Sequence, residues 1–353
     1  MMKGRIALVV VSLVLSVLIG FSLSKQNAGS VESAEGAGEI VIGLSMDTLK
    51  EARWQKDRDY FVEKVKELGG NVLVQSANSD DTRQIQDVKA LLANGVDVLV
   101  VVPHDGAAMA EAVRLAEGAG VPVIAYDRII TDCDLDIYLS FDNVRVGEQQ
   151  AQYLVDALPD GKGKIARIYG APTDHNARLF KDGQDLVLSP LIARGDIEVV
   201  HEDWAQDWDP ANAKKIMNAA ITKGLAFDAV LASNDGTAGG AIQALKEAKL
   251  AGKTIVTGQD AEAVACQRIA GGTQSMTIYK PIQQLATRAA ELAMDMANGK
   301  PVVANGSVPN GQKDVPALLL ATTVVDSSNL RETVVADGFH TAEDIFGDSG
   351  GAE

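Results

Sequence analysis

Charged, amide and indole side chains collect in this sequence directly after short apolar runs. Asp, Asn, Arg and Lys make directed, partly bidentate hydrogen bonds, and an indole offers a flat apolar face. That combination suits a neutral ring compound with several hydroxyls and C–H patches on its faces, as a monosaccharide has. The residues concerned are Arg53, Trp54, Asp127, Arg128, Asp174, Asn176, Trp204, Trp208, Asn234, Asp235, Gln259, Asp260 and Lys280.

A few such contacts are enough to hold a small ligand. A hydrogen bond to a charged group contributes roughly 1.5–3 kcal/mol net, whereas micromolar affinity requires about 8 kcal/mol. Each residue alone also has a structural interpretation: Asp127 and Arg128 could form a surface ion pair worth about 0–1 kcal/mol. Trp54 and Trp204 could be packing residues, and Lys280 a solvated helix start. Their joint position at strand ends favours binding.

The elements that must position these residues are read from the apolar pattern. From Glu39 onward, short β-branched runs alternate with amphipathic stretches of helical length, which predicts parallel sheets covered by helices on both faces. Ligands of open α/β sheets bind at the carboxyl ends of the strands, where the polar set falls. The strands predicted in the first half are Ile40–Met46, Asn71–Ser76, Val96–Pro103, Val121–Tyr126 and Asp136–Ser140, and the helices are Lys56–Leu68, Thr82–Asn94 and Ala107–Gly118.

The alternation restarts after Asn143, so a second lobe of the same architecture is expected. Its predicted elements are the helix Val144–Leu158 and the strands Lys164–Tyr169, Ala229–Ser233 and Thr254–Gly258. A strand at Ser275–Tyr279 then leads into a helix at Pro281–Asn298, and Val315–Val325 is extended again. The chain is therefore expected to cross between the lobes more than once.

The sequence contains no motif with the spacing required for catalysis, phosphate binding or metal binding. Gly252-Lys253-Thr254 lacks the spacing of a phosphate-binding loop and precedes a strand instead of following one. The Gly-rich run 234–240 does not match a dinucleotide fingerprint and predicts a tight turn opening a helix. The four histidines are scattered without metal-ligand spacing, and no nucleophile elbow is present. We expect no enzyme activity, no cofactor and no metal.

The N-terminus predicts export. Lys3 and Arg5 precede a long apolar run from Ile6 to Leu23, so residues 1–24 are a signal peptide or an uncleaved anchor, and 25–38 a flexible linker. The net charge of −16 argues against nucleic acid and anionic membrane surfaces as partners. The expected location is periplasmic or cell-surface, with tethering by the N-terminal segment left open.

From about Glu39 to about His340, the sequence resembles the D-xylose-binding branch of the type I periplasmic sugar-binding proteins, which serve bacterial ABC importers. The resemblance is specific, because whole strand-end segments match. They are 51–59 (EARWQKDRD), 74–78 (VQSAN), 125–128 (AYDR), 138–143 (YLSFDN), 232–235 (ASND), 257–260 (TGQD), 279–281 (YKP) and 313–316 (KDVP), together with the stretch from Ser233 to Leu245.

The resemblance implies an α/β fold of the type I periplasmic binding protein class, with two doubly wound parallel-sheet lobes joined by a multi-crossover hinge. The N-terminal sugar-binding lobe would be 39–142 plus 280–308, and the C-terminal lobe 143–279 plus 309–345. Carried over residue by residue, it also implies that a pyranose is hydrogen-bonded by Arg53, Asp127, Arg128, Asn176, Asn234, Asp260 and Lys280, with Trp208 as stacking platform and Trp54 over the opposite face.

The partners implied by the resemblance are D-xylose and the membrane permease of an ABC importer. D-glucose is a second candidate ligand, since it differs from D-xylose only by a hydroxymethyl group, which a pocket discriminates modestly unless its wall blocks the group. The alternative function is a sugar-loaded sensory input protein for a membrane chemoreceptor or sensor. The sequence leaves oligomeric state, permease identity and leader cleavage open.

Overall fold

The computed structural model describes residues 39–347. The chain divides into one unit up to Glu39 and a second from Ile40, and the second is described below. The predicted leader (1–24) and the linker (25–38) lie outside the described residues. Within the described part of the chain, no helix is long and apolar enough to cross a membrane.

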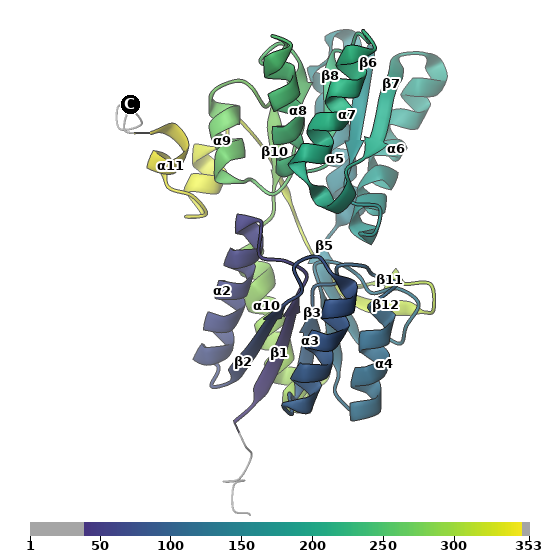
Figure 1. Cartoon of the computed structure of the whole chain (residues 1–353). Helices are drawn as coiled ribbons and strands as arrows, with labels where there is room; N and C mark the ends of the chain where they lie inside the picture. The colour runs from purple at the N-terminus through teal and green to yellow at the C-terminus, as the bar shows by residue number, and fades with distance from the viewer. Residues whose placement is uncertain (1–38, 348–353) are drawn as a thin grey trace, which may run out of the picture. The chain divides into compact units, whose positions relative to one another are not determined.

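The first lobe is built on a seven-stranded sheet with the order β11-β12-β5-β4-β3-β1-β2, parallel except for β11 (Figure 1). Helices α2 and α10 pack on one face and α3 and α4 on the other, each pair closing its own apolar core. The elements are β1 Val41–Met46, α2 Ala52–Glu67, β2 Asn71–Ser76, α3 Asp81–Ala93, β3 Val98–Val101, α4 Ala110–Ala119, β4 Val123–Tyr126, β5 Ile137–Phe141, α10 Ile282–Ala297, β11 Gly306–Pro309 and β12 Asp314–Leu320.

The second lobe contains a parallel sheet of order β7-β6-β8-β9 and, beside it, the antiparallel pair β10-β13. Its apolar cores again lie on both faces of the parallel sheet. The elements are α5 Asn143–Ala157, η1 Pro159–Gly161, β6 Gly163–Tyr169, α6 His175–Arg194, β7 Ile197–Trp204, η2 Gln206–Trp208, α7 Pro210–Thr222, β8 Ala229–Ala232, α8 Asp235–Glu247, β9 Ile255–Val256, α9 Ala263–Ala270, β10 Met276–Tyr279, β13 Thr323–Asp326, η3 Arg331–Val335 and α11 Ala342–Phe346.

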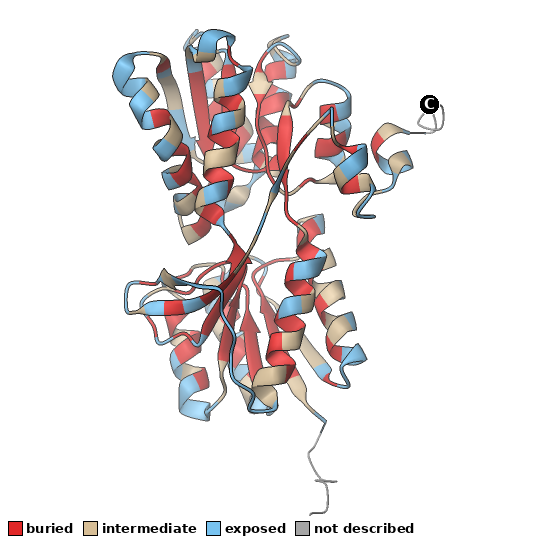
Figure 2. Ribbon diagram, turned by 180° about the vertical axis from the view of Figure 1, so that it is seen from behind, coloured by how far each residue is buried: buried red, intermediate tan, exposed pale blue. Residues whose placement is uncertain are grey.

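The apolar pattern explains why these segments become strands and helices. All residues of β3, β4, β5 and β8 are buried, as expected for parallel strands covered on both faces (Figure 2). Several helices begin at a side chain that accepts a hydrogen bond from the first turn, such as Asp80, Asp142 and Asn234. The predicted α/β class with two doubly wound lobes is confirmed.

Helices α5 and α6 approach each other too closely for side chains at their contact. A Cβ on Gly147 would lie 2.0 Å from the Phe180 carbonyl oxygen, and one on Gly183 would lie 1.9 Å from the Val144 carbonyl oxygen. Glycine at these two positions therefore allows α6 to lie against α5. That contact fixes the N-terminal turn of α6, which carries Asn176.

The chain passes between the two lobes three times: after β5, after β10 and after β12. The sequence-based placement of 309–345 in the second lobe differs from the observed pairing, because β12 lies parallel to β5 in the first sheet. The extended run predicted at Val315–Val325 is in fact two strands, and the third crossing falls at Ala321 and Thr322, between them. Helix α6 and strand β7 were not predicted.

Candidate ligand-binding site

A pocket of about 450 Å³, counted out to its open mouth, lies where the carboxyl ends of strands from both lobes meet. All of the residues proposed as sugar contacts from the sequence line it. They are Arg53, Trp54, Asp127, Arg128, Asn176, Trp208, Asn234, Asp260 and Lys280.

Arg53 connects the two lobes through the floor of the pocket. It lies in the first turn of α2, and its guanidinium donates to Asp127 of the first lobe and to Asp260 Oδ1 of the second, 3.2 Å away. Its Nε lies 3.3 Å from Asp57 Oδ2 on the same helix face. Lys280, which follows β10, reaches the same Asp260 oxygen at 3.2 Å. The Asp260 carboxylate is thus held by cations from both sides.

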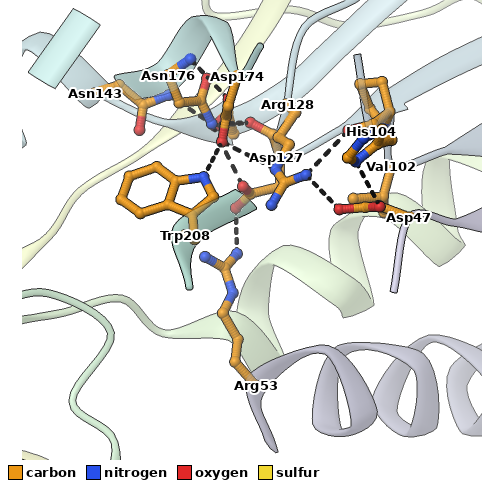
Figure 3. A network of polar contacts seen from close by, with 12 residues as sticks. Asp47, Arg53, Val102, His104, Asp127, Arg128, Asn143, Asp174, Asn176 and Trp208 are labelled. Carbon is orange, nitrogen blue, oxygen red and sulfur yellow. Dashed lines mark hydrogen bonds and ion pairs between the residues drawn. The ribbon is translucent and has the colours of Figure 1, made fainter. Parts of the chain in front are cut away.

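Arg128 makes a second connection between the lobes (Figure 3). Its Nη1 lies 2.7 Å from Asp47 Oδ2, and its Nε lies 3.0 Å from Asp174 Oδ2 at the start of α6. The other Asp47 oxygen meets His104 Nδ1 at 3.0 Å. The guanidinium is therefore clamped between one carboxylate from each lobe and can present only its remaining edge to a ligand.

The indole of Trp208 is held in place by three features of the second lobe. Its Nε1 donates to Asp174 Oδ2 at 3.1 Å, and its ring meets Phe180 edge to face at a centroid distance of 6.3 Å. Gly170 makes room for it, since a Cβ there would lie 2.0 Å from Trp208 Cη2. A fixed aromatic face in a polar pocket can stack against the C–H face of a sugar ring.

Trp54 lies on the opposite side of the same pocket and belongs to the first-lobe core. The guanidinium carbons of Arg53 and Arg128 lie 4.4 and 5.2 Å from the centroid of its ring. Trp54 therefore stacks against both arginines in addition to packing. Its proposed role over the second face of a sugar remains a prediction.

Three residues that line the pocket have a left-handed backbone conformation. Asp127, Trp208 and Asp260 have φ of 62°, 56° and 96°, a region that residues with a Cβ rarely adopt. Hydrogen bonds impose the strained geometry on Asp127: its carbonyl accepts from Ser140 Oγ at 2.6 Å and from Asn176 Nδ2 at 2.8 Å. Such strain persists only where surrounding contacts over-determine it, and it turns these side chains into the pocket.

Buried charges at the site modify one another's proton affinities. Burial alone would raise the pKa of Asp127, but Arg53 and Lys280 outweigh it and hold the pKa below its usual range. Burial and the nearby Asp260 carboxylate raise the pKa of Glu262 to about 7. Burial also raises the pKa of Glu51, with Arg128 acting against it.

The arrangement favours a neutral, polyhydroxylated ligand. Arg53 and Arg128 each pair with at least two carboxylates, so the positive charge of each is already compensated without an anionic ligand. A group that neither brings nor removes charge leaves the charge balance of these residues unchanged, whereas a charged ligand would have to compete with their partners. Among residues 39–347, no group of three or more His, Cys, Asp or Glu could hold a metal ion.

Four residues that line the pocket are not among the sugar contacts that the resemblance implies: Glu51, Phe180, Gln259 and Glu262. Gln259 belongs to the polar residues at the strand ends, and Phe180 follows Asn176 by four positions, so the two share a helix face. Trp204 does not line the pocket; its ring stacks on Tyr169 with centroids 4.8 Å apart. Asp174 and Asp235 support the site from behind.

Comparison with known proteins gives concordant matches. A model of the periplasmic binding protein domain matches residues 42–301. The D-xylose-binding periplasmic protein of Haemophilus influenzae is 47% identical over 315 residues, 89% of this chain and 94% of the relative. The D-xylose-binding periplasmic protein of Escherichia coli is 47% identical over 313 residues, which cover 88% of this chain and 94% of that relative. A carbohydrate transporter solute-binding protein from Chloroflexus aurantiacus in complex with D-glucose has a TM-score of 0.82 at 33% identity, over 87% of this chain and 98% of that one.

Proposed function

The chain belongs to the periplasmic binding protein family, and from this premise we propose that it captures a monosaccharide, first of all D-xylose, and delivers it to an ABC importer. It is a binding protein and not an enzyme in this proposal. The relatives at 47% identity are periplasmic by description, which supports an extracytoplasmic location. Attachment of the protein to the membrane through residues 1–24 remains a prediction, because these residues lie outside the described part of the chain.

The observation that carries the proposal is the convergence of both lobes on one pocket. Arg53 and Arg128 enter from the first lobe, Trp208 and Asp260 enter from the second, and Lys280 enters at a crossing. A sugar bound among them gains contacts in the closed form that neither lobe offers alone. That difference in affinity is what any ligand-driven closure requires.

Hydrogen bonds to the sugar would replace contacts between protein side chains that separate when the sugar binds. Hydroxyls both donate and accept, so a sugar can insert between Arg53 and Asp260 and satisfy each of them. The closed form, with its two lobes bridged by ligand, would be the form that the membrane permease recognises. The permease therefore receives loaded protein in preference to empty protein.

D-glucose is the second candidate ligand, on one specific observation. The Chloroflexus aurantiacus protein, 33% identical, is described in complex with D-glucose. The two sugars differ by one hydroxymethyl group, so the pocket wall beside C5 decides between them. A sensory role for the loaded protein at a membrane receptor would use the same closed form.

Calorimetric titration of the protein with D-xylose, D-glucose, D-ribose and L-arabinose tests the proposal. We expect D-xylose to bind with a Kd of about 1 μM or tighter, equivalent to about 8 kcal/mol, with ribose and arabinose much weaker. The absence of heat with all four sugars, in folded protein freed of carried-over sugar, would refute it. Product analysis after long incubation with xylose should return the sugar unchanged.

A further inference from the structure

Two oxygen atoms in the wall of the pocket are buried without a hydrogen-bond partner. They are Oε1 of Gln259 and Oε2 of Glu51, and both residues line the pocket. Gln259 is 2% exposed, so solvent does not reach its side-chain amide. Buried polar atoms in folded proteins almost always have a partner, and an orphan therefore asks for an explanation.

Local structure does not explain either oxygen. Glu51 precedes α2, but its side chain makes no capping hydrogen bond to that helix. Gln259 contributes to the fold through its backbone, whose carbonyl accepts from Asp235 N at 2.9 Å. Neither side chain is needed to hold the element on which it lies.

The two residues come from opposite lobes and line the same pocket. Glu51 lies between β1 and α2 of the first lobe, and Gln259 follows β9 of the second. Glu262, two residues beyond Asp260, faces the same space and senses the charge of Glu51. Glu51, Gln259 and Glu262 thus add oxygen acceptors to a pocket whose cations, Arg53, Arg128 and Lys280, already have carboxylate partners.

We propose that Gln259 and Glu51 form an acceptor subsite that receives hydrogen bonds from hydroxyl groups of the bound sugar. The subsite rests on the proposed function, and it adds Gln259 and Glu51 to the sugar contacts that the resemblance implies. Hydroxyl protons are the natural occupants, because the ring oxygen of a pyranose has no proton to donate. The subsite thus distinguishes sugars by the orientation of their hydroxyl groups, while the arginines and Lys280 donate hydrogen bonds to hydroxyl oxygens.

The pKa of Glu51 is raised by burial, with Arg128 lowering it and Asp47 and Asp260 raising it further. Those three groups face it from the segment after β1, from the segment after β4 and from the second lobe, and Glu262 of the second lobe is a further carboxyl that interacts with it. A sugar hydroxyl donating to the carboxylate would favour its ionised form. Sugar binding should therefore release protons at a pH where Glu51 is partly protonated.

The test pairs protein variants with D-xylose and its four monodeoxy analogues in calorimetric titrations. The variants are Gln259→Leu, which removes the acceptor, Gln259→Glu, which keeps one, and Glu51→Gln. Matched controls are Gln283→Leu and Glu63→Gln, exposed positions on α10 and α2. Thermal unfolding of each variant reports on folding.

In the wild type, at least one deoxy analogue should bind about tenfold or more weakly than xylose, as expected for the loss of one hydrogen bond to a buried partner. Gln259→Leu should bind xylose about tenfold more weakly and lose that discrimination, whereas Gln259→Glu and both controls retain it. Equal discrimination in Gln259→Leu and wild type would overturn the subsite.

A crystal structure of the wild type with xylose provides a readout that needs no variant. Ligand oxygens within about 3.2 Å of Gln259 Oε1 and Glu51 Oε2 are expected. Only water at both oxygens would overturn the subsite while leaving the proposed function intact. A wild type that binds none of the sugars would instead refute the proposed function, and the subsite with it.

Discussion

Asp174 offers the sharpest test of how the pocket is supported, because it touches three functional elements without lining the pocket itself. Its Oδ1 accepts from Asn176 N at 2.9 Å, and its Oδ2 accepts from Arg128 Nε at 3.0 Å and Trp208 Nε1 at 3.1 Å. Substitution of this one carboxylate should therefore loosen the stacking indole and one bridging arginine together.

The magnitude follows from those three contacts. Asp174→Ala removes a helix cap worth about 1 kcal/mol and two hydrogen bonds to a charged group, from Arg128 and Trp208, worth about 1.5–3 kcal/mol each. The free energy of unfolding should fall by about 4–7 kcal/mol and sugar affinity by about 10- to 100-fold. Asp174→Asn can keep the cap with its single amide oxygen, but its Nδ2 would then face Arg128 Nε and Trp208 Nε1, which are donors themselves. It should therefore lose both of those hydrogen bonds, about 3–6 kcal/mol of stability, and about 10- to 100-fold in affinity.

Urea unfolding and calorimetric titration with D-xylose measure the two effects separately. Asp80→Ala is the matched control, since Asp80 caps α3 by accepting from Arg83 N and does not line the pocket. It should lose about 1 kcal/mol of stability and no affinity. Wild-type affinity in Asp174→Ala would refute the reasoning, because it would mean that Arg128 and Trp208 need no support from this carboxylate.

Three other outcomes are expected. Trp208→Ala and Asp260→Ala should each weaken D-xylose binding at least about tenfold in calorimetry while the fold is retained, through the loss of a stacking face and of a charged hydrogen-bond partner. Gly170→Ala should weaken binding and change tryptophan fluorescence, because its Cβ would lie 2.0 Å from the indole. Since burial raises the pKa of Glu262 from 4.5 to about 7, the folded form holds a proton that the unfolded form releases between those values. The unfolding free energy should therefore fall as pH rises through that window, by at most about 1.4 kcal/mol per pH unit, and Glu262→Gln should flatten the profile.

Each of these outcomes has a clear opposite. Unchanged affinity in both Trp208→Ala and Asp260→Ala would remove the basis for the site. Unchanged fluorescence and affinity in Gly170→Ala would mean that the indole is not confined by the backbone beneath it. A pH profile of stability that is the same in Glu262→Gln as in wild type would mean that this carboxyl titrates near its ordinary pKa when folded.

The local sequence predicted several elements well. The strand at Asn71–Ser76 has the expected bounds, and the helices predicted at Thr82–Asn94 in the first lobe and Val144–Leu158 in the second are found within one residue of them at each end. The two helices combine an apolar period with a capping residue, and both signals are local. Helix α6 was missed because its apolar stripe is interrupted by Gly183, where it packs against α5, and by Pro190.

The sequence by itself determined the fold class and the chemical types of side chain at the carboxyl ends of the strands, because both follow from periodicity and from the rule that parallel strands end at one edge. Only the tertiary structure decided which charges meet. The pairing of Arg128 with Asp174, the room that Gly170 leaves for Trp208 and the third crossing after β12 depend on residues far apart in the chain. Such contacts are set by how whole lobes pack, and no local pattern encodes that packing.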